Sequence, residues 1–350
     1  CVLKAAGYTS GIFGKWDLGV HRRYLPLARG FDIFYGFVNT GIDYYTHERY
    51  GVPSMYRNNS PTTADKGTYC TDLFEREAVR FLEVNRRKPF FLYVPFNAPH
   101  GASNLDPTIR GGAQAPGRFK GMYPKLQEQV GTEQRSRYGE TFTVPNRAAR
   151  RLEFVGSVTA MDAAIGRLLD LLDEYGIADN TIIIFFSDNG GGGSADNAPL
   201  RGRKGQMFEG GIRVPCIVKW PGKIPAGTTS NAFLTSLEIL PTLCAATGAV
   251  PTKGVPLDGF DMLSVLQGKR ASARTEMFWQ RKLDKGARVG HWKWVESSRG
   301  KGLFDLRHDI GERRDLSKER PEILKKVQAR FANWKKQMQA AEPRGPFRDF

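Results

Sequence analysis

The feature that most constrains the fold is a run of six β-branched or apolar residues, Thr181 to Phe186. A run of this length and composition predicts a strand buried on both faces, as in the central sheet of an α/β protein. In the preceding segment, 148–175, apolar residues recur every three or four positions, and Gly176 follows it. This spacing predicts a long amphipathic helix that ends at the glycine. A helix leading into a buried strand favours an α/β layered fold.

Other segments continue the alternation of helix and strand. Residues 72–84 have helical spacing, residues 89–96 are typical of a buried strand between prolines, and residues 101–146 predict a long surface insertion that could cover a site. Further along the chain, we expect a strand at 213–219 and a helix at 237–246.

The sequence changes in character after residue 270. Short pieces with strand character, at 276–280, 288–296 and 302–306, precede a final helix at 319–339. We therefore expect an α/β domain over residues 1–270 and a smaller α+β subdomain over residues 271–350.

The charge balance narrows the classes of partner. The chain has 52 Lys and Arg against 36 Asp and Glu, a net charge of +16, and 350 residues without a nucleic-acid-binding motif. Basic surfaces attract nucleic acids, acidic glycans and anionic membranes. Positive charge is the only feature that points to a nucleic acid here, and no recognisable motif supports it, so no nucleic acid is expected as partner. No apolar run approaches the roughly 20 residues that a membrane span requires.

Two strand ends carry side chains suited to chemistry. His100 follows the strand at 89–96, where it could bind an anion or act as a general acid, or simply be satisfied within a turn. Asp188 and Asn189 follow the strand at 181–186 and offer two hard oxygen ligands, which suit Ca²⁺ or Mg²⁺. Asp-Asn-Gly is also a common turn, so the residues alone leave both interpretations open.

Two basic segments are further candidates. Arg201, Arg203 and Lys204 stand among glycines and could hold an oxyanion such as sulfate or phosphate, although a plain basic loop has the same composition. Lys15, in Gly14-Lys15-Trp16, is not part of a phosphate-binding P-loop, because Trp16 stands where that motif needs Ser or Thr.

The order and spacing of these segments resemble the formylglycine-dependent (type I) sulfatases of the alkaline-phosphatase superfamily. Within the family the chain is most similar to arylsulfatase B, an N-acetylgalactosamine-4-sulfatase, through Arg29-Gly30-Phe31-Asp32, Asp43-Tyr44-Tyr45-Thr46-His47-Glu48-Arg49, Leu200-Arg201-Gly202-Arg203-Lys204 and Pro256-Leu257-Asp258-Gly259-Phe260-Asp261. The stretches that match the family in general run through nearly the whole chain. The stretches are Gly7-Tyr8-Thr9 with Gly14-Lys15-Trp16, Ala98-Pro99-His100, Ser187-Asp188-Asn189-Gly190-Gly191, Leu200-Arg201-Gly202-Arg203-Lys204 with Glu209-Gly210-Gly211-Ile212-Arg213, and Gly302-Leu303-Phe304-Asp305-Leu306 with Glu312.

The resemblance implies a fold, an activity and residue roles. The fold would be an alkaline-phosphatase-like central mixed sheet flanked by helices, and the activity hydrolysis of a sulfate ester on a carbohydrate. Asp188 and Asn189 would ligand Ca²⁺, Lys15 and Lys204 would bind sulfate oxygens, and His100 would bind the sulfate and protonate the leaving alkoxide. Family members of this kind act outside the cytoplasm, in the periplasm, the lysosome or the exterior.

Two departures from the family pattern affect the mechanism. This sequence contains neither the C/S-x-P-S-R motif that yields the formylglycine nucleophile nor the Asp ligands that lie upstream of it in the family. It opens at Cys1 in the middle of a pattern typical of a helix end followed by a turn and a strand. We therefore expect a fragment that lacks an amino-terminal part, including a central strand, and is inactive and poorly soluble alone. Asp17 stands where the family has His, and His21 is a possible substitute base.

Three functions remain open from the sequence. The first is a sulfatase in which Lys15, His100, Lys204 and Asp17 form the catalytic set. The second is a non-catalytic relative that binds acidic glycans, which Asp17 motivates. The third is a phosphatase or phosphodiesterase of the same superfamily, which is less favoured because two-metal sites need more ligands than five scattered histidines readily supply.

Overall fold

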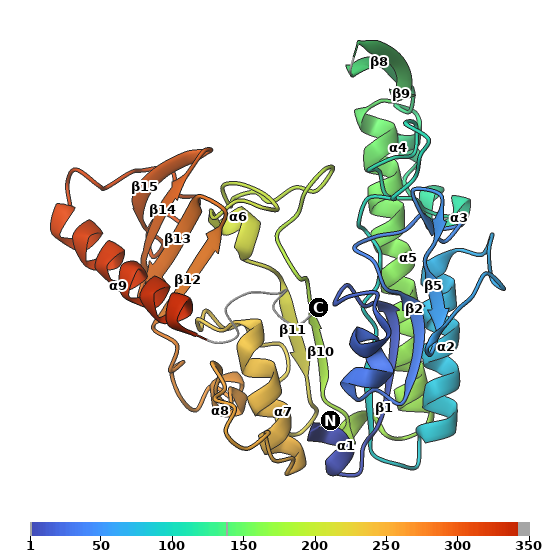
Figure 1. Ribbon diagram of the computed structural model, residues 1–350, viewed down its shortest axis with the longest axis horizontal. Coiled ribbons are helices and arrows are strands. Elements are labelled where there is room, and N and C mark those ends of the chain that lie inside the picture. The colour runs from blue at the N-terminus through green and yellow to red at the C-terminus, as the bar shows by residue number, and fades with distance from the viewer. Residues whose placement is uncertain (1, 138, 342–350) are drawn as a thin grey trace. The chain divides into compact units, whose positions relative to one another are not determined.

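The computed structural model describes residues 2–137 and 139–341, which form two compact units (Figure 1). Unit 1 comprises Cys1–Ile182, Trp220–Ala226 and Ser236–Asp261, and unit 2 comprises Ile183–Lys219, Gly227–Thr235 and Met262–Phe350. These units interleave along the chain and do not coincide with the expected domains 1–270 and 271–350, which stay a prediction. Cys1 and residues 342–350 of those domains lie outside the described residues.

Unit 1 is built on a mixed five-stranded sheet of order β6-β5-β2-β1-β7. β1 is parallel to both β2 and β7, whereas β5 runs antiparallel to β2 and β6 antiparallel to β5. Short strands β3 and β4 pair separately. The strands are β1 (Thr9–Lys15), β2 (Ile33–Phe37), β3 (Glu48–Arg49), β4 (Val52–Pro53), β5 (Met55–Arg57), β6 (Ser60–Pro61) and β7 (Phe90–Tyr93).

Both faces of the central strands are buried, because successive side chains of a strand point to opposite faces. Phe13 and Tyr35 belong to one apolar cluster, which includes Phe74 from α2, and Ile12 and Phe34 belong to another. All five side chains are at most 1 % exposed. Strands buried on both faces are expected for the central sheet of an α/β fold.

Helices α2 (Cys70–Asn85) and α5 (Arg147–Glu174) confirm the two long helices predicted from apolar spacing. α5 begins at Asn146, whose side chain accepts a hydrogen bond from the Ala149 N–H at 2.8 Å, and Gly176, with φ of 66°, follows its end. The remaining helices of unit 1 are α1 (Val2–Ala5), α3 (Gly117–Lys120), α4 (Pro124–Gln127), α7 (Ile239–Thr247) and the 3₁₀ turns Arg22–Tyr24, Pro26–Arg29, Ala178–Asn180 and Ser236–Glu238.

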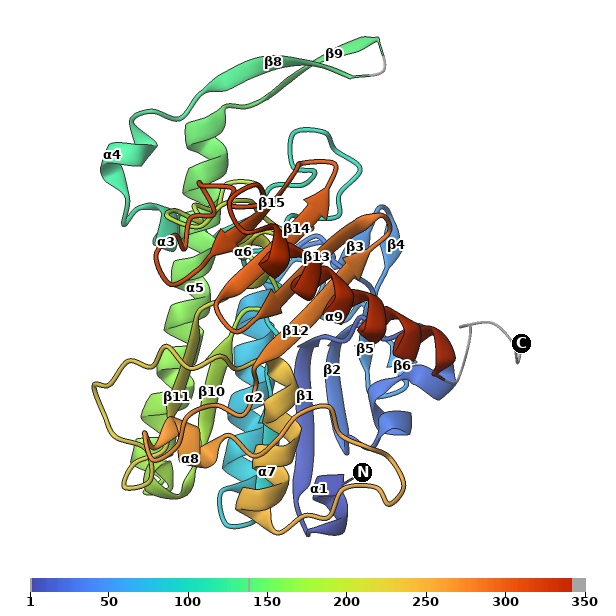
Figure 2. The ribbon, with the colours of Figure 1, turned by 90° about the vertical axis from the view of Figure 1, so that its left-hand side faces the viewer.

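The expected surface insertion at 101–146 contains more regular structure than its composition indicated. Besides α3 and α4 it forms a hairpin of β8 (Thr132–Arg137) and β9 (Glu140–Pro145), which extends beyond the amino-terminal end of α5 (Figure 2). None of the described helices combines the length and the apolar character needed to cross a bilayer.

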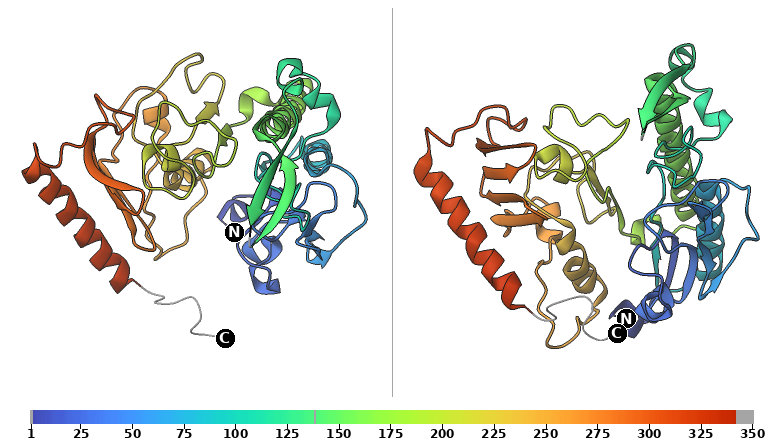
Figure 3. Two further views of the ribbon diagram at one scale, coloured as in Figure 1. Left: turned by 90° about the horizontal axis from the view of Figure 1, so that it is seen from above. Right: turned by 45° about the horizontal axis from the view of Figure 1, so that its top comes forward.

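Unit 2 contains a four-stranded antiparallel meander covered by α9, which packs on β13 and β14 (Figure 3). Phe331 and Val327 of α9 are buried against Trp294 and Ala287 of the sheet. Its elements are β10 (Ile183–Phe186), α6 (Glu209–Ile212), β11 (Cys216–Lys219), α8 (Leu263–Leu266), β12 (Glu276–Arg281), β13 (Asp284–Val289), β14 (Trp292–Ser297), β15 (Gly300–Asp305) and α9 (Pro321–Ala340).

Two sequence expectations were wrong in detail. The strand predicted at 181–186 forms as β10, but within the described chain it pairs only with β11, antiparallel, and Phe186 is 37 % exposed. It is therefore not buried on both faces. The single strand expected at 288–296 is interrupted by a turn at Gly290, with φ of 59°, which separates β13 from β14.

Candidate functional site

Lys15 is the last residue of β1, and the glycine before it explains how this strand ends. Gly14 has φ of 140°, and a Cβ at this position would stand 2.1 Å from the carbonyl oxygen of Pro95. Because glycine has no Cβ, the backbones come close enough for the Lys15 N–H to donate to that carbonyl at 2.8 Å. The backbone of Lys15 is thereby fixed to the segment that follows β7.

Asp17 lies beside Lys15 in a left-handed backbone conformation, with φ of 56°. Its Oδ2 is 3.2 Å from the Lys15 Nζ, and the side chains are 37 % and 19 % exposed, respectively. The intervening Trp16 is buried and its indole N–H donates to the Tyr24 carbonyl at 2.7 Å, which anchors the turn. Such a partly exposed ion pair contributes about 1 kcal/mol or less, so it can open when another anion approaches the ammonium.

His100 is held by its backbone and by one ring nitrogen. It follows a cis Ala98–Pro99 bond, and its carbonyl accepts a hydrogen bond from the Tyr44 hydroxyl at 2.8 Å. Its Nδ1 is 2.9 Å from the Gly101 carbonyl oxygen. Because a carbonyl only accepts, Nδ1 carries the proton of this hydrogen bond.

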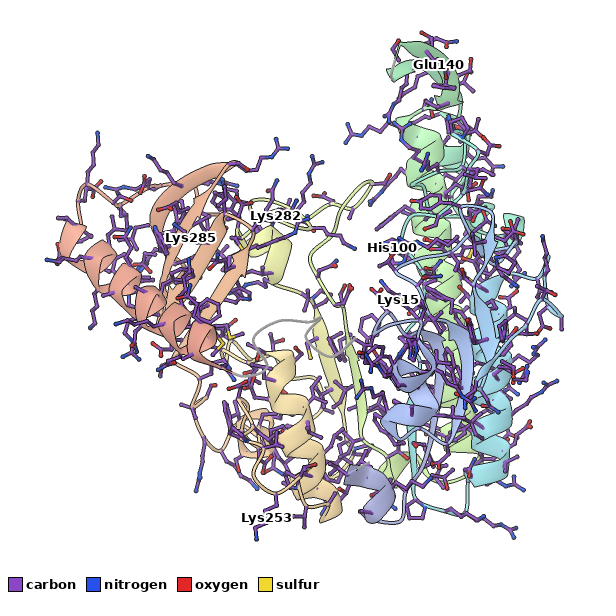
Figure 4. All side chains as sticks on the ribbon, in the orientation of Figure 1. Lys15, His100, Glu140, Lys253, Lys282 and Lys285 are labelled. Carbon is purple, nitrogen blue, oxygen red and sulfur yellow. The ribbon has the colours of Figure 1, made fainter. Side chains whose placement is uncertain are left out.

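Lys15 and His100 lie at the same edge of the sheet of unit 1 (Figure 4). β1 and β7 are adjacent and parallel, with Ile12 opposite Tyr93, so their carboxyl ends point the same way. Ligands of α/β sheets bind at this edge. Within unit 1, the structure therefore brings a cation, a carboxylate and an imidazole to one sheet edge; the sequence had placed only His100 at a strand end.

Asp188 and Asn189 lie in unit 2, in the loop that follows β10. The loop is fixed through its backbone: the Ser187 hydroxyl donates to the Asn189 carbonyl at 3.0 Å, and the Gly190 N–H donates to the Gly211 carbonyl at 3.0 Å. The Asp188 side chain is exposed and that of Asn189 partly buried. The carboxylate of Asp188 is thus presented on a constrained turn.

Lys204 is tied to the same loop. Its backbone N–H donates to the Gly191 carbonyl at 3.0 Å, while its side chain is exposed. Asn197 joins the two segments: its Oδ1 accepts from the Gly191 N–H at 3.0 Å, and its Nδ2 donates to the carbonyls of Gly191 at 2.9 Å and Gly202 at 3.1 Å. Sequence reasoning missed Asn197, because nothing in the sequence marks a loop residue whose amide bridges two backbone segments.

A buried charged cluster contacts the loop that bears Lys204, because Arg201 of that loop donates to the Glu312 carbonyl at 3.0 Å. Lys293 on β14 is fully buried, and its Nζ is 2.8 Å from Glu209 Oε1 and 3.7 Å from Glu312 Oε1. Arg213 Nε donates to the other oxygen of Glu209 at 2.7 Å. Glu312 Oε2 accepts the backbone N–H of Glu209 at 2.7 Å, which links the segment after β15 to the start of α6. The sequence motif included Glu209 and Glu312 but gave no reason to pair them.

The pKa values of the two carboxylates in this cluster are shifted in opposite directions. Burial alone would raise the pKa of Glu209, but the charges and hydrogen bonds of Lys293 and Arg213 outweigh it and lower the pKa to about 2. Burial raises the pKa of Glu312 to about 7, because Lys293 is closer to Glu209 and the Glu209 charge repels a second carboxylate.

The described residues do not complete the expected calcium site. Asp188 and Asn189 supply oxygen donors of the right type, but Ca²⁺ takes six to eight oxygen ligands. No group of three or more His, Cys, Asp or Glu side chains that could hold a metal ion occurs within residues 2–137 and 139–341. These two donors fit calcium chemistry only as part of a larger ligand set.

The structure defines an α/β protein with basic and acidic side chains at the ends of its strands, and comparison with known proteins identifies its class. The Sulfatase family model matches residues 2–249, more than half of the chain, so the chain belongs to the sulfatase family. It is 29 % identical to mouse arylsulfatase J over 95 % of this chain and 61 % of that protein. It is 30 % identical to human N-acetylgalactosamine-6-sulfatase over 85 % of this chain and 54 % of that protein.

The chain therefore spans less than two thirds of the length of these curated relatives. The names differ from arylsulfatase B, so the resemblance to that branch in particular stays a prediction. Among solved structures, Ps i-CgsB matches with a TM-score of 0.79 and 29 % identity, covering 95 % of this chain and 72 % of that one. The same enzyme is also known in complex with k-i-k-neocarrahexaose, a carbohydrate.

Proposed function

We propose that this chain is part of a sulfuric ester hydrolase that removes sulfate from a sulfated carbohydrate such as an N-acetylgalactosamine sulfate. The observation that carries the proposal is the placement of Lys15 and His100 at the carboxyl ends of two adjacent parallel strands. Family membership and the names of the relatives support the reaction class, and the complex of Ps i-CgsB with a carbohydrate supports a glycan substrate.

Each side chain has a role that follows from the charge of the ester. Hydrolysis converts R–O–SO₃⁻ and water into R–OH, sulfate and a proton, and it breaks the S–O bond. Lys15 and Lys204 bind sulfate oxygens and offset the charge that develops on them. His100, with Nδ1–H engaged by the Gly101 carbonyl, donates its Nε2 proton to the leaving alkoxide oxygen.

The nucleophile is not among these 350 residues, since no C/S-x-P-S-R motif occurs in the sequence. Asp188 and Asn189 would hold Ca²⁺ together with further ligands, and the ion would supply positive charge to the substrate sulfate. The 350-residue chain by itself is therefore proposed to be inactive. We place the complete protein outside the cytoplasm, in line with the kind of substrate.

A second candidate function rests on Asp17. A carboxylate 3.2 Å from Lys15 Nζ adds negative charge where a sulfate anion would approach, and it replaces the His of the family pattern. This favours a non-catalytic relative that binds acidic glycans without turning them over. The two functions predict the same binding residues and differ in whether sulfate is released.

Binding of inorganic sulfate to the 350-residue chain, measured by isothermal titration calorimetry, tests the residue roles. Lys15→Ala and Lys204→Ala should each weaken binding by about tenfold, because each removes a charge-assisted hydrogen bond. Lys253→Ala and Lys336→Ala are matched controls, since both lysines are exposed. Lys253 belongs to unit 1, as Lys15 does (Figure 4), and Lys336 lies on α9 of unit 2, the unit of Lys204. Equal binding by all four variants would refute the assignment.

The reaction itself is tested at the level of the coding DNA and of turnover. An in-frame extension upstream of Cys1 that carries paired Asp residues and a C/S-x-P-S-R motif would support the hydrolase. The extended protein should then release sulfate from N-acetylgalactosamine 6-sulfate, and His100→Ala should abolish release while His308→Ala does not. An in-frame start without the motif, or binding without release, would support the glycan-binding relative instead.

A further inference from the structure

Unit 2 contains a cavity of about 360 Å³ next to the loop that bears Asp188 and Asn189. A glycine-rich loop, residues 191–202, forms most of its wall, and Arg203 and Arg313 complete the lining. All of these residues belong to unit 2. The two arginines come from segments 110 positions apart, so the fold assembles this wall from separate parts of the chain.

The wall of the cavity is held in place by hydrogen bonds. Asn197 bridges Gly191 and Gly202 through three hydrogen bonds of 2.9 to 3.1 Å. On the other side, the N–H of Arg313 donates to Asp309 Oδ2 at 2.7 Å. A Cβ added to Gly311 would stand 3.0 Å from the Pro199 carbonyl oxygen, so the turn before Arg313 packs directly on the loop. The arginines therefore project from fixed backbone.

The charge of the cavity is not balanced by its own residues. Neither Arg203 nor Arg313 has a carboxylate within ion-pair distance among the described residues, and Asp196 is the acidic residue in the lining. Asp196 Oδ1 is engaged by the Ala198 N–H at 2.9 Å. By contrast, the neighbouring Arg314 donates to both oxygens of Glu319, at 3.0 and 2.9 Å.

Two exposed arginines that line one cavity without a carboxylate partner attract an anion to it. Guanidinium is planar and binds carboxylate or sulfate oxygens through two parallel hydrogen bonds, which gives both strength and orientation. A cavity of this volume has room for one such group together with part of a sugar ring. Arg203 immediately precedes Lys204 in the chain, so one oligosaccharide can span both residues and place an anionic group at each.

We propose that this cavity is a subsite for a second anionic group, a sulfate or a carboxylate, on an acidic oligosaccharide. The proposal rests on the proposed function and narrows its substrate class: the preferred ligand is an oligosaccharide with at least two negative groups rather than a singly sulfated sugar. Arg203 and Arg313 recognise the second group, while Lys204 recognises the sulfate ester that reacts.

Binding of defined sugars to the 350-residue chain tests the subsite. The probes are N-acetylgalactosamine 6-sulfate, a chondroitin 6-sulfate tetrasaccharide, its desulfated form and a neocarratetraose bearing sulfate but no carboxylate. Arg203→Ala and Arg313→Ala should each weaken binding of the tetrasaccharide by about tenfold and leave the monosaccharide within about twofold of wild type. If the two arginine variants bind the desulfated tetrasaccharide more weakly than wild type does, the subsite recognises a carboxylate. If they bind the neocarratetraose more weakly, it recognises a sulfate.

Arg314→Ala is the matched control, because it removes the same charge one residue away from Arg313 but outside the cavity lining. Its binding of every probe should stay within about twofold of wild type, apart from the small general effect of one surface charge. If Arg314→Ala weakens the tetrasaccharide as much as Arg313→Ala does, the effect is general attraction to a basic surface and the subsite is refuted.

A second measurement does not depend on the folding of variants. Phenylglyoxal modifies accessible guanidinium groups, and mass spectrometry of the peptides reports the extent at each arginine. The chondroitin 6-sulfate tetrasaccharide should protect Arg203 and Arg313 and not Arg314; equal modification with and without it would overturn the proposal.

Failure of the subsite and failure of the hydrolase function give different results. If the tetrasaccharide protects Arg203 and Arg313 and their variants bind it more weakly, but the extended protein releases no sulfate, the subsite stands and the glycan-binding relative is favoured. Sulfate release from N-acetylgalactosamine 6-sulfate and from the tetrasaccharide alike, with no effect of Arg203→Ala or Arg313→Ala, would keep the hydrolase and remove the subsite.

Discussion

Replacing Lys293 by methionine tests whether the buried charged cluster holds the Lys204 loop in place. Lys293 is 0 % exposed, and its Nζ lies 2.8 Å from Glu209 and 3.7 Å from Glu312. Methionine has a similar length but no charge, so Lys293→Met keeps most of the packing and leaves two buried carboxylates facing each other.

The cost follows from what remains after the ammonium is removed. Breaking a buried ion pair by removing one partner costs about 3–5 kcal/mol, because the other charge stays buried without compensation. Arg213 still binds Glu209 Oε2 at 2.7 Å, and Glu312 can take up a proton, since burial already raises its pKa to about 7. Both effects reduce the penalty, so we expect a loss near the low end, about 3 kcal/mol.

Urea unfolding of the 350-residue chain, followed by tryptophan fluorescence, measures this loss. Trp279, whose ring centroid is 5.2 Å from Lys293 Nζ, and the buried Trp294 report on the region. Hydrogen exchange gives the local counterpart: the amide of Glu209, which donates to Glu312, should exchange faster in the variant.

Lys285→Met is the matched control. Lys285 lies on the neighbouring strand β13 and pairs with Glu296 at 2.5 Å, but both side chains are partly exposed. An exposed pair contributes about 0–1 kcal/mol, so the same chemical change should have little effect there. If Lys293→Met and Lys285→Met lower the free energy of unfolding equally, the cluster does not stabilise the loop as argued.

Three further substitutions have defined outcomes. The pKa of Glu312 is about 7 in the folded protein against an ordinary 4.5, so its contribution to stability is complete below pH 4.5 and is lost as pH rises through 7. The free energy of unfolding in urea should therefore fall by about 3 kcal/mol between pH 4.5 and pH 8 in the wild type, and this fall should be absent in Glu312→Gln. Gly14→Ala should cost more than about 3 kcal/mol in thermal or urea unfolding, because its Cβ would stand 2.1 Å from a backbone oxygen, whereas Gly166→Ala, in open space on α5, should be neutral or stabilising. Asp17→Asn should tighten binding of inorganic sulfate by about two- to fivefold in calorimetry, since it removes the charge that competes for Lys15; unchanged or weaker binding would contradict the competition.

The fold was predictable wherever a local pattern sufficed to determine structure. Apolar spacing located α2 and α5, and Gly176 marked the end of α5. The hairpin β8–β9 was not foreseen, because its strands carry mostly polar residues and have no periodic apolar face. The burial of β10 was overestimated, because a run of apolar residues indicates a strand but does not specify how many neighbours it pairs with.

The site was predictable only where motif order carried the information. Motif order proposes Lys15, His100 and Lys204 as site residues, which stay a prediction, and the structure shows what fixes their backbone or ring: a glycine contact with Pro95, a carbonyl on the ring of His100 and the Asn197 bridge. Those supports depend on residues that meet through folding. The spacing of residues along the chain does not reveal these contacts, so Asn197 and the Arg203–Arg313 cavity could be found only in the three-dimensional structure.

We expect Asp17 to weaken the binding of an anion at Lys15 without preventing it. A partly exposed Lys15–Asp17 pair is worth about 1 kcal/mol or less, so an anion that approaches the ammonium can displace the carboxylate. A loss of about fivefold in affinity is the most that a pair of this strength can cause. Asp17 alone therefore does not decide between the two proposed functions, because both bind a sulfate group at Lys15. They differ in whether sulfate is released, so a measurement of release is what separates them.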